Sequence, residues 1–193
     1  MIQIAVVDDH ELVRTGFRMI LEQQPDLRVC GEAGTAEDGL ELIGALKPQV
    51  AVVDVHMPGM SGIELTERVR CAGLPTHIVV VTVVEDGRFP RRMLEVGATG
   101  YLTKGCSADE LVKAVRLAAR GRRYLAPAVA QQLALASIDG GASPFDVLSS
   151  RELEVAMMLV HGKTLTLIGD QLNLSPKTGF HAGTAENSEK QCN

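Results

Sequence analysis

Short runs of β-branched residues alternate with longer stretches of helical periodicity from residue 2 to about residue 120, and few folds are compatible with this alternation. It is typical of a parallel sheet whose two faces are covered by helices. The runs are almost continuously apolar, as expected of strands that are buried on both faces. The predicted strands are Ile2–Val7, Leu27–Ala33, Val50–Asp54, His77–Val81 and Gly100–Thr103. We therefore predict an α/β domain over residues 1–122, with a doubly wound, five-stranded parallel sheet.

Helices are predicted between these strands from their caps and stop signals. The first is expected from near Leu12 to Gln23, and the second is expected over Ala36–Leu46 with Thr35 as its N-cap. The last helix is predicted to begin after Ser107, because Glu110 follows three residues later and completes a capping box.

The composition indicates a folded chain with an aliphatic core. Of the 193 residues, 46% are hydrophobic and 22% are charged, which is ordinary for a globular protein and excludes a disordered or collagen-like polymer. Aromatic residues make up only 3%, without tryptophan, so a base-stacking surface and a sugar-binding platform are excluded. The net charge of −5 excludes a chain-wide basic surface, so any contact with nucleic acid has to be local.

The sequence also bears on where the protein works. No apolar run approaches the roughly 18 residues that a membrane span requires. The amino terminus begins a strand pattern and not a signal segment. We expect a cytoplasmic protein with no membrane partner.

A second, smaller unit follows the predicted sheet domain. Residues 123–147 lose both periodicities and are predicted to be a linker, apart from a short helix at Val129–Ala136. Further helices are predicted at Leu148–Val160 and Leu165–Leu172, and the start of another follows near Pro176. Beyond Thr178 no apolar pair recurs at helical spacing, so residues 179–193 are expected to form no ordered element.

Polar side chains follow four of the predicted strands at the point where each strand ends. They are Asp8 and Asp9, Asp54, Thr82 and Lys104. The carboxyl ends of parallel strands meet at one edge of a sheet, where ligands of such folds bind. Carboxylates packed together repel one another unless a hard cation neutralises them, and Mg²⁺ is the cation that fits this donor set best. A carboxylate held there is also a nucleophile toward phosphorus, with a lysine and a threonine to contact the phosphoryl oxygens.

Each of these residues alone has a simpler interpretation. An isolated acidic pair is usually a solvated turn, and an aspartate after a strand is often a helix cap. His10 and His56 flank the group, and solvent exposure is the simpler interpretation of both. Taken together at successive strand ends, however, the carboxylates, the threonine and the lysine indicate one site.

The residues at these positions resemble the receiver domains of two-component response regulators, which have a flavodoxin-like fold. The resemblance covers about residues 1–122. Its motifs are Val6-Val7-Asp8-Asp9-His10, Asp54-Val55-His56-Met57-Pro58-Gly59, Val80-Val81-Thr82 and Gly100-Tyr101-Leu102-Thr103-Lys104. The protein is then a signalling protein and not an enzyme, although it assists its own phosphoryl transfer and dephosphorylation.

The resemblance implies a role for each site residue. Asp54 is the implied phosphoacceptor, supplied by a sensor histidine kinase or a phosphotransfer protein. Asp9, Asp54 and the backbone carbonyl of His56 are the implied direct ligands of Mg²⁺, and Asp8 helps through water. Thr82 and Lys104 are implied to contact the phosphoryl group, while Tyr101 moves inward as Thr82 is drawn to the phosphate. Val84 and His56 are expected to border the phosphoryl group, and an apolar Val84 predicts slow self-dephosphorylation.

Residues 148–178 resemble the opening of a helix-turn-helix of the NarL/FixJ (LuxR-type) class. The likeness rests on Leu148-Ser149-Ser150-Arg151-Glu152-Leu153-Glu154-Val155 and Leu172-Asn173-Leu174-Ser175-Pro176-Lys177-Thr178. With Arg14-Thr15-Gly16 and Ser143-Pro144-Phe145-Asp146, the chain is similar to the GacA/UvrY branch of that class. The resemblance implies regulation of transcription, a homodimer, and promoter DNA contacted near Ser175, Lys177 and Thr178.

The sequence departs from this class after Thr178. Gly179 interrupts the expected reading helix, and residues 143–193 carry four basic against six acidic side chains, a net charge of −2. The all-α module is therefore expected to be small and incomplete, with an aberrant or truncated carboxyl end. The alternative is a phosphoacceptor module that binds kinase and protein partners without sequence-specific DNA binding. An aspartate-based phosphatase is disfavoured, because the adjacent pair Asp8-Asp9 lacks the Asp-x-Asp spacing of such enzymes.

Overall fold

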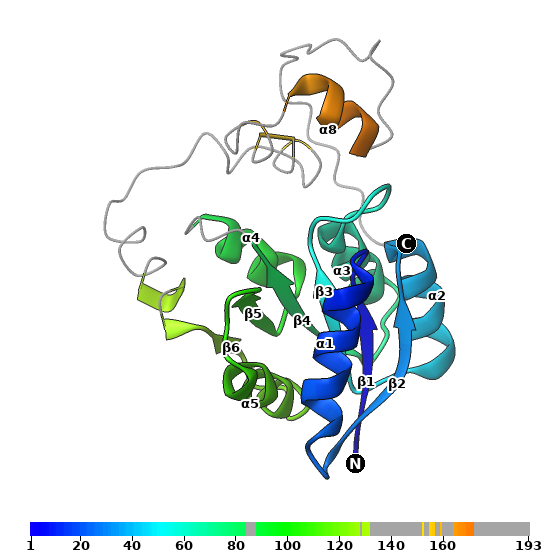
Figure 1. Cartoon of the computed structure of the whole chain (residues 1–193), viewed down its shortest axis with the longest axis vertical. Helices are drawn as coiled ribbons and strands as arrows, with labels where there is room; N and C mark the ends of the chain where they lie inside the picture. Colours follow the sequence, from blue (N-terminus) through cyan, green and yellow to red (C-terminus); the bar gives the residue numbers. More distant parts are fainter. Residues whose placement is uncertain are drawn as a thin grey trace.

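The computed structural model describes residues 1–83, 88–127, 129–131, 152, 155–156, 159 and 164–171. The described residues up to Leu125 form one sheet with its covering helices (Figure 1). In chain order the elements are β1 (Ile2–Val7), α1 (Glu11–Glu22), β2 (Leu27–Ala33), α2 (Ala36–Leu46), β3 (Val50–Asp54), α3 (Gly62–Cys71), β4 (His77–Thr82), α4 (Arg88–Val96), β5 (Gly100–Thr103), α5 (Ala108–Ala118) and β6 (Tyr124–Leu125).

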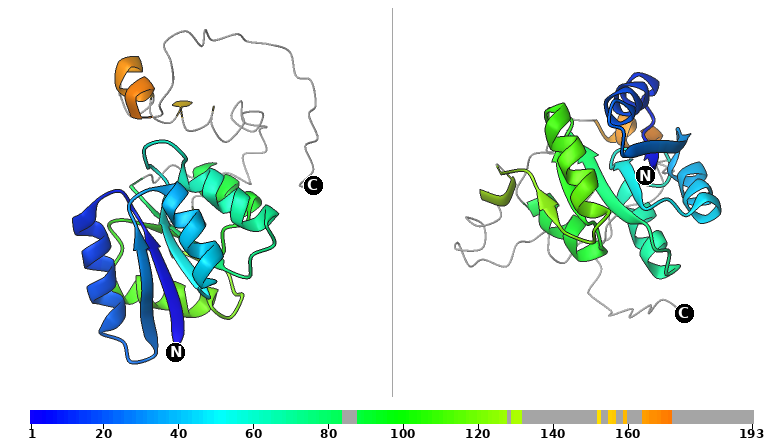
Figure 2. Two further views of the ribbon diagram at one scale, coloured as in Figure 1. Left: turned by 90° about the vertical axis from the view of Figure 1, so that its right-hand side faces the viewer. Right: turned by 90° about the horizontal axis from the view of Figure 1, so that it is seen from below.

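The sheet is parallel throughout and has the order β2-β1-β3-β4-β5-β6. The chain first adds β2 on one side of β1 and then crosses to add β3 on the other side, so the winding direction changes between β1 and β3. Helices α1 and α5 contact each other, α2 contacts α3 and α3 contacts α4, and the two groups cover opposite faces of the sheet (Figure 2). The predicted doubly wound α/β architecture is confirmed.

The central strands are aliphatic because both of their faces are covered. Residues 4–7 of β1, all of β3 and residues 78–82 of β4 are buried. Continuous burial explains why these strands show uninterrupted apolar runs and no alternation with polar residues. The core is therefore built mainly from valine, isoleucine, leucine and alanine side chains.

The sheet has a sixth strand, which the sequence pattern does not predict. Tyr124 and Leu125 pair in parallel with Gly100 and Tyr101, so the first residues of the predicted linker belong to the sheet. Two residues are too few to show a period of two, and the charged pair Arg122-Arg123 precedes them. This strand therefore forms by backbone pairing with the edge of β5 and not from a local sequence preference.

The helix caps agree with the sequence. The Thr35 hydroxyl accepts a hydrogen bond from the backbone N–H of Asp38, 3.1 Å away, at the start of α2. Ser107 and Glu110 form the predicted capping box at the start of α5. Helix α1 begins one residue before the predicted Leu12 and ends at Glu22.

In the carboxyl-terminal part, α8 (Leu165–Gln171) lies where a helix was predicted, and residues 152, 155, 156 and 159 of the preceding predicted helix are helical. Ile168 is buried and packs against Val155. The remaining predictions for this region, including Ser175, Lys177, Thr178 and the segment 179–193, lie outside the described residues, as does Val84. Among the described helices, none is long and apolar enough to cross a membrane.

Candidate functional site

The predicted site residues gather at the carboxyl edge of the sheet. Asp8 and Asp9 follow β1, Asp54 is the last residue of β3, and Lys104 follows β5. The change of winding direction between β1 and β3 places this cluster where ligands of open parallel sheets bind. The structure thus brings together residues from three separate strand ends.

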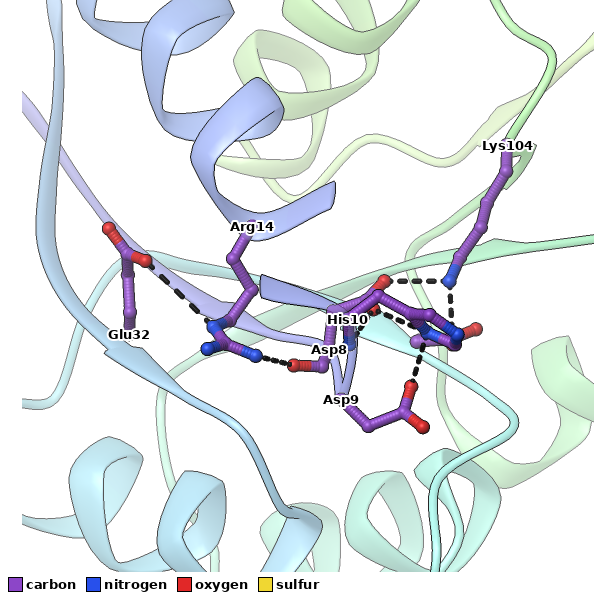
Figure 3. Close-up of polar contacts among 7 residues, drawn as sticks. Asp8, Asp9, His10, Arg14, Glu32 and Lys104 are labelled. Atoms are coloured by element: carbon purple, nitrogen blue, oxygen red, sulfur yellow. Dashed lines mark hydrogen bonds and ion pairs between the residues drawn. The ribbon is translucent and has the colours of Figure 1, made fainter. Parts of the chain in front are cut away.

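Lys104 connects two of the carboxylates. Its Nζ lies 2.7 Å from Oδ2 of Asp54 and 2.8 Å from Oδ2 of Asp8. Figure 3 shows the lysine pointing into the group formed by Asp8, Asp9 and His10. One ammonium therefore bridges two carboxylates.

Burial governs the ionisation of Asp54. Loss of solvation raises the pKa of Asp54 from 3.8 to about 6, with a further upward contribution from the charge of Asp8. The hydrogen bond and charge of Lys104 and the backbone N–H of His56 act in the opposite direction. Burial likewise disfavours the Lys104 ammonium, but its bonds to the two aspartates outweigh this and raise its pKa. At neutral pH the pair is a carboxylate and an ammonium.

Thr82 and Tyr101 are both fully buried at this end of the sheet. Thr82 is paired with Thr103 in the β4–β5 ladder, and its carbonyl accepts a hydrogen bond of 2.7 Å from the backbone N–H of Lys104. This bond holds the base of the lysine beside the end of β4. Tyr101 lies on the neighbouring strand β5, in the core of the sheet.

The cluster fits a hard divalent cation. Ligand atoms of Asp8, Asp9, His10 and Asp54 all lie within 4.8 Å of one another. Three carboxylates against one lysine leave an excess of negative charge, and their oxygens are the donors that Mg²⁺ prefers. His56, the predicted carbonyl ligand, lies in the loop directly after β3.

A close backbone approach shapes the loop after Asp54. The backbone N–H of Gly62 donates to the carbonyl of Val55 at 2.9 Å. A Cβ at Gly62 would overlap the carbonyl oxygen of Asp54, so only glycine is accommodated there. Gly59 has a φ of 81°, in the left-handed region that also favours glycine.

Two residues at the site were not assigned a role from the sequence. His10 is exposed as expected, but its Nδ1 lies 2.7 Å from Oδ1 of Asp9. Arg14 lies in the first turns of α1, and its Nη1 donates a hydrogen bond of 2.6 Å to the main-chain carbonyl of Asp8. The sequence signal for Arg14 is its place in the Arg14-Thr15-Gly16 motif, which assigns it no contact.

Comparisons with known proteins agree with this geometry. A family model described as "Response regulator receiver domain" matches residues 4–116, and one described as "Bacterial regulatory proteins, luxR family" matches residues 146–181. The chain is 46% identical to the response regulator GacA of Pseudomonas viridiflava over 92% of this chain and 84% of the relative. It is 41% identical to the response regulator UvrY of Escherichia coli (strain K12), over 92% and 83% of the two chains. A crystal structure of a LuxR-family two-component response regulator from Aurantimonas sp. SI85-9A1 superposes with a TM-score of 0.69 at 34% identity, covering 72% of this chain and 99% of the other.

Proposed function

Because the chain belongs to the response regulators that join a receiver domain to a LuxR-type domain, and is a phosphorylation-activated regulator of transcription, we propose that Asp54 is the residue that accepts the phosphoryl group. Lys104 and Thr82 contact that group, and Tyr101 responds to it from the neighbouring strand.

The contact between Lys104 and Asp54 is the observation that carries this proposal. Asp54 is buried at the end of a central strand and lies 2.7 Å from the ammonium of Lys104. The same ammonium can therefore pair with an oxygen of a phosphoryl group attached to Asp54. A purely structural ion pair would not require the further carboxylates of Asp8 and Asp9 at the same place. Their repulsion is tolerated because the site works with a cation.

The chemistry is transfer of a phosphoryl group from a phosphohistidine. A carboxylate oxygen of Asp54 forms a bond to phosphorus while the phosphorus–nitrogen bond breaks, and the imidazole leaves with the bonding electron pair. The ammonium of Lys104 then pairs with a phosphoryl oxygen, and the hydroxyl of Thr82 donates to another. Asp9, Asp54 and the carbonyl of His56, with Asp8 through water, would hold Mg²⁺. When bound, the ion supplies positive charge against the phosphoryl oxygens.

The proposed division of the chain is a receiver at residues 1–122, a linker at 123–147, a partial helix-turn-helix at 148–178 and an aberrant tail at 179–193. The two family matches, to residues 4–116 and 146–181, support the receiver and the helix-turn-helix. The phosphoryl donor is a sensor histidine kinase or a phosphotransfer protein in the cytoplasm. A homodimer contacts promoter DNA through Ser175, Lys177 and Thr178. The LuxR-family match favours this output over a module that never contacts DNA.

Exposure to a small phosphodonor tests the first half of the proposal. The full chain is incubated with phosphoramidate and Mg²⁺, and its intact mass is followed. A gain of one phosphoryl group is expected in the wild type and in Asp38→Asn, a control in the exposed first turn of α2. The gain should be absent from Asp54→Asn. An equal gain in Asp54→Asn would assign the phosphoryl group to another residue.

DNA binding is tested separately. Random duplex DNA is selected on the phosphorylated full chain, and the affinity of the selected fragments is measured as a function of salt. Binding that weakens steeply with salt, and that weakens further in Lys177→Ala, is expected. Absence of any salt-dependent binding would instead support the phosphoacceptor module without DNA output.

A further inference from the structure

Arg14 reaches back from α1 to the main chain of the acidic loop. Its Nη1 donates a hydrogen bond of 2.6 Å to the carbonyl oxygen of Asp8, six residues earlier (Figure 3). The side chain is largely buried, with 18% of its surface exposed. A charged donor at this distance makes one of the stronger kinds of hydrogen bond in a protein. The contact therefore joins the first part of α1 to the residue that precedes Asp9.

The Asp8 carbonyl accepts this hydrogen bond from Arg14 at the point where the ladder between β1 and β2 ends. The N–H of Asp8 still pairs with the carbonyl of Ala33 at 3.2 Å, as the last bond between the β1 and β2 segments. If the parallel ladder continued, the Asp8 carbonyl would accept a hydrogen bond from the backbone N–H two residues after Ala33. The chain turns there instead, and Thr35 caps α2. The guanidinium of Arg14 takes the place of that donor.

Glu32, on β2, places a carboxylate beside the guanidinium. Its Oε2 lies 4.0 Å from Nε of Arg14, and its Oε1 lies 3.0 Å from Nη1 of Arg18. The carboxylate offsets the charge of Arg14, so the guanidinium acts beside the site as a hydrogen-bond donor and competes less with a bound cation.

Asp8 is thus held at three points besides its backbone N–H, which is bonded to Ala33. Its Oδ1 accepts a hydrogen bond of 2.9 Å from the backbone N–H of His10, and its Oδ2 lies 2.8 Å from Nζ of Lys104. Arg14 adds the main-chain carbonyl, which is the point of attachment of the next residue, Asp9. Without that anchor, repulsion among the carboxylates would move the backbone of Asp9 away from Asp54.

We propose that Arg14 is a positioning residue of the cation site, which holds the Asp8–Asp9 backbone so that the carboxylate of Asp9 stays beside that of Asp54. This inference rests on the proposed function, since it assumes that the acidic cluster binds Mg²⁺. Arg14 acts through the Asp8 carbonyl and does not touch the cation.

Mg²⁺ titration of the full chain by calorimetry tests the proposal. The dissociation constant is expected to rise about tenfold in Arg14→Met, as is typical when a partner of a metal ligand is removed. Arg18→Met is the matched control, because it removes a cation from the same Glu32 without touching Asp8. Its affinity is expected to stay within about twofold of the wild type. Arg14→Lys is expected to recover only part of the affinity, because an ammonium keeps the charge but lacks the planar, fixed donor geometry of the guanidinium that bonds the Asp8 carbonyl.

A second measurement separates positioning from general destabilisation. Amide hydrogen exchange at Asp9 and His10, without Mg²⁺, is expected to accelerate in Arg14→Met and not in Arg18→Met. Urea unfolding of each variant shows whether the fold is retained. If Arg14→Met does not fold, Arg14→Gln replaces it, because the shorter neutral side chain also cannot span to the Asp8 carbonyl.

The outcomes distinguish this inference from the proposed function. An unchanged Mg²⁺ affinity in folded Arg14→Met, or an equal loss in Arg18→Met, overturns the positioning role and leaves phosphorylation of Asp54 intact. If the wild type binds no Mg²⁺ and Asp9→Asn changes nothing, the cation site itself is overturned, and the positioning role falls with it.

Discussion

Lys104 and Asp54 meet across the end of an intervening strand. Their Nζ and Oδ2 atoms lie 2.7 Å apart, although the residues are 50 positions apart in the chain and belong to the ends of β5 and β3. β4 lies between those two strands in the sheet, so a long, flexible side chain is needed to reach the aspartate. The backbone N–H of Lys104 donates a hydrogen bond to the carbonyl of Thr82 at the end of β4, and this bond fixes the backbone position from which the side chain extends.

Removal of the lysine should slow phosphorylation of Asp54. In Lys104→Met the rate of mass gain with phosphoramidate and Mg²⁺ is expected to fall about a hundredfold, as when one positioned donor is removed from other active sites. Lys113→Met serves as the control, because Lys113 lies on the exposed face of α5 and over the ring of Tyr124. Equal rates in Lys104→Met and the control would show that the ammonium plays no part in transfer.

The raised pKa of Asp54 predicts a pH-dependent gain in stability for Asp54→Asn. In the folded protein this carboxyl has a pKa of about 6, against 3.8 ordinarily, so its ionisation costs stability as pH rises through that window. The two values correspond to a difference on the order of 3 kcal/mol. In Mg²⁺-free buffer Asp54→Asn should therefore unfold at higher urea than the wild type above about pH 6, with the gain shrinking toward about pH 4. A gain that does not vary with pH would contradict burial as the cause.

Substitution of Gly62 should disturb the backbone of Asp54. In Gly62→Ala the new Cβ would overlap the Asp54 carbonyl oxygen, and we expect a loss of about 1–3 kcal/mol in the free energy of unfolding. Gly44→Ala on α2 is the control, since nothing lies within 4 Å of a Cβ there and a gain of about 0.5–1 kcal/mol is expected. Urea unfolding measures both changes. Equal stability of the two variants would mean that the loop after β3 adapts.

A surface ion pair far from the site predicts a different pH dependence. The hydrogen bonds from Arg116, at 2.6 and 2.8 Å, lower the pKa of Asp26. Their stabilising effect is present above the ordinary pKa of an aspartate and is lost as pH falls through the lowered value. Asp26→Asn should therefore melt slightly below the wild type at neutral pH, with the difference vanishing in acid and shrinking in high salt. Thermal melts at both pH values measure this, and a difference that persists in acid would point to packing instead.

Several parts of the molecule were predictable from local patterns. The runs Ile2–Val7 and Val50–Asp54 are apolar because their strands are covered on both faces, and this made them visible in the sequence. The cap at Ser107 was visible because its partner, Glu110, is only three residues away. Strand β6 was missed because it is two residues long and depends on pairing with β5.

The roles of His10 and Arg14 could not be predicted for a related reason. The guanidinium of Arg14 lies near Glu32, a residue of β2, and its hydrogen-bond acceptor is a main-chain carbonyl that carries no sequence signal. His10 was expected to be exposed, and it is exposed, but only the loop geometry sets its Nδ1 beside Asp9. Contacts of this kind depend on how separate segments pack.

Hydrophobic periodicity and strand ends are local properties of the chain, so the fold class and the set of side chains at the carboxyl edge of the sheet could be predicted from residue order. The tertiary structure alone decided the order of the strands, the shared contact of Lys104 with Asp8 and Asp54, and the raised pKa of Asp54. Those properties depend on distances between segments far apart in the chain and on the exclusion of water around them, and neither exists until the segments have packed.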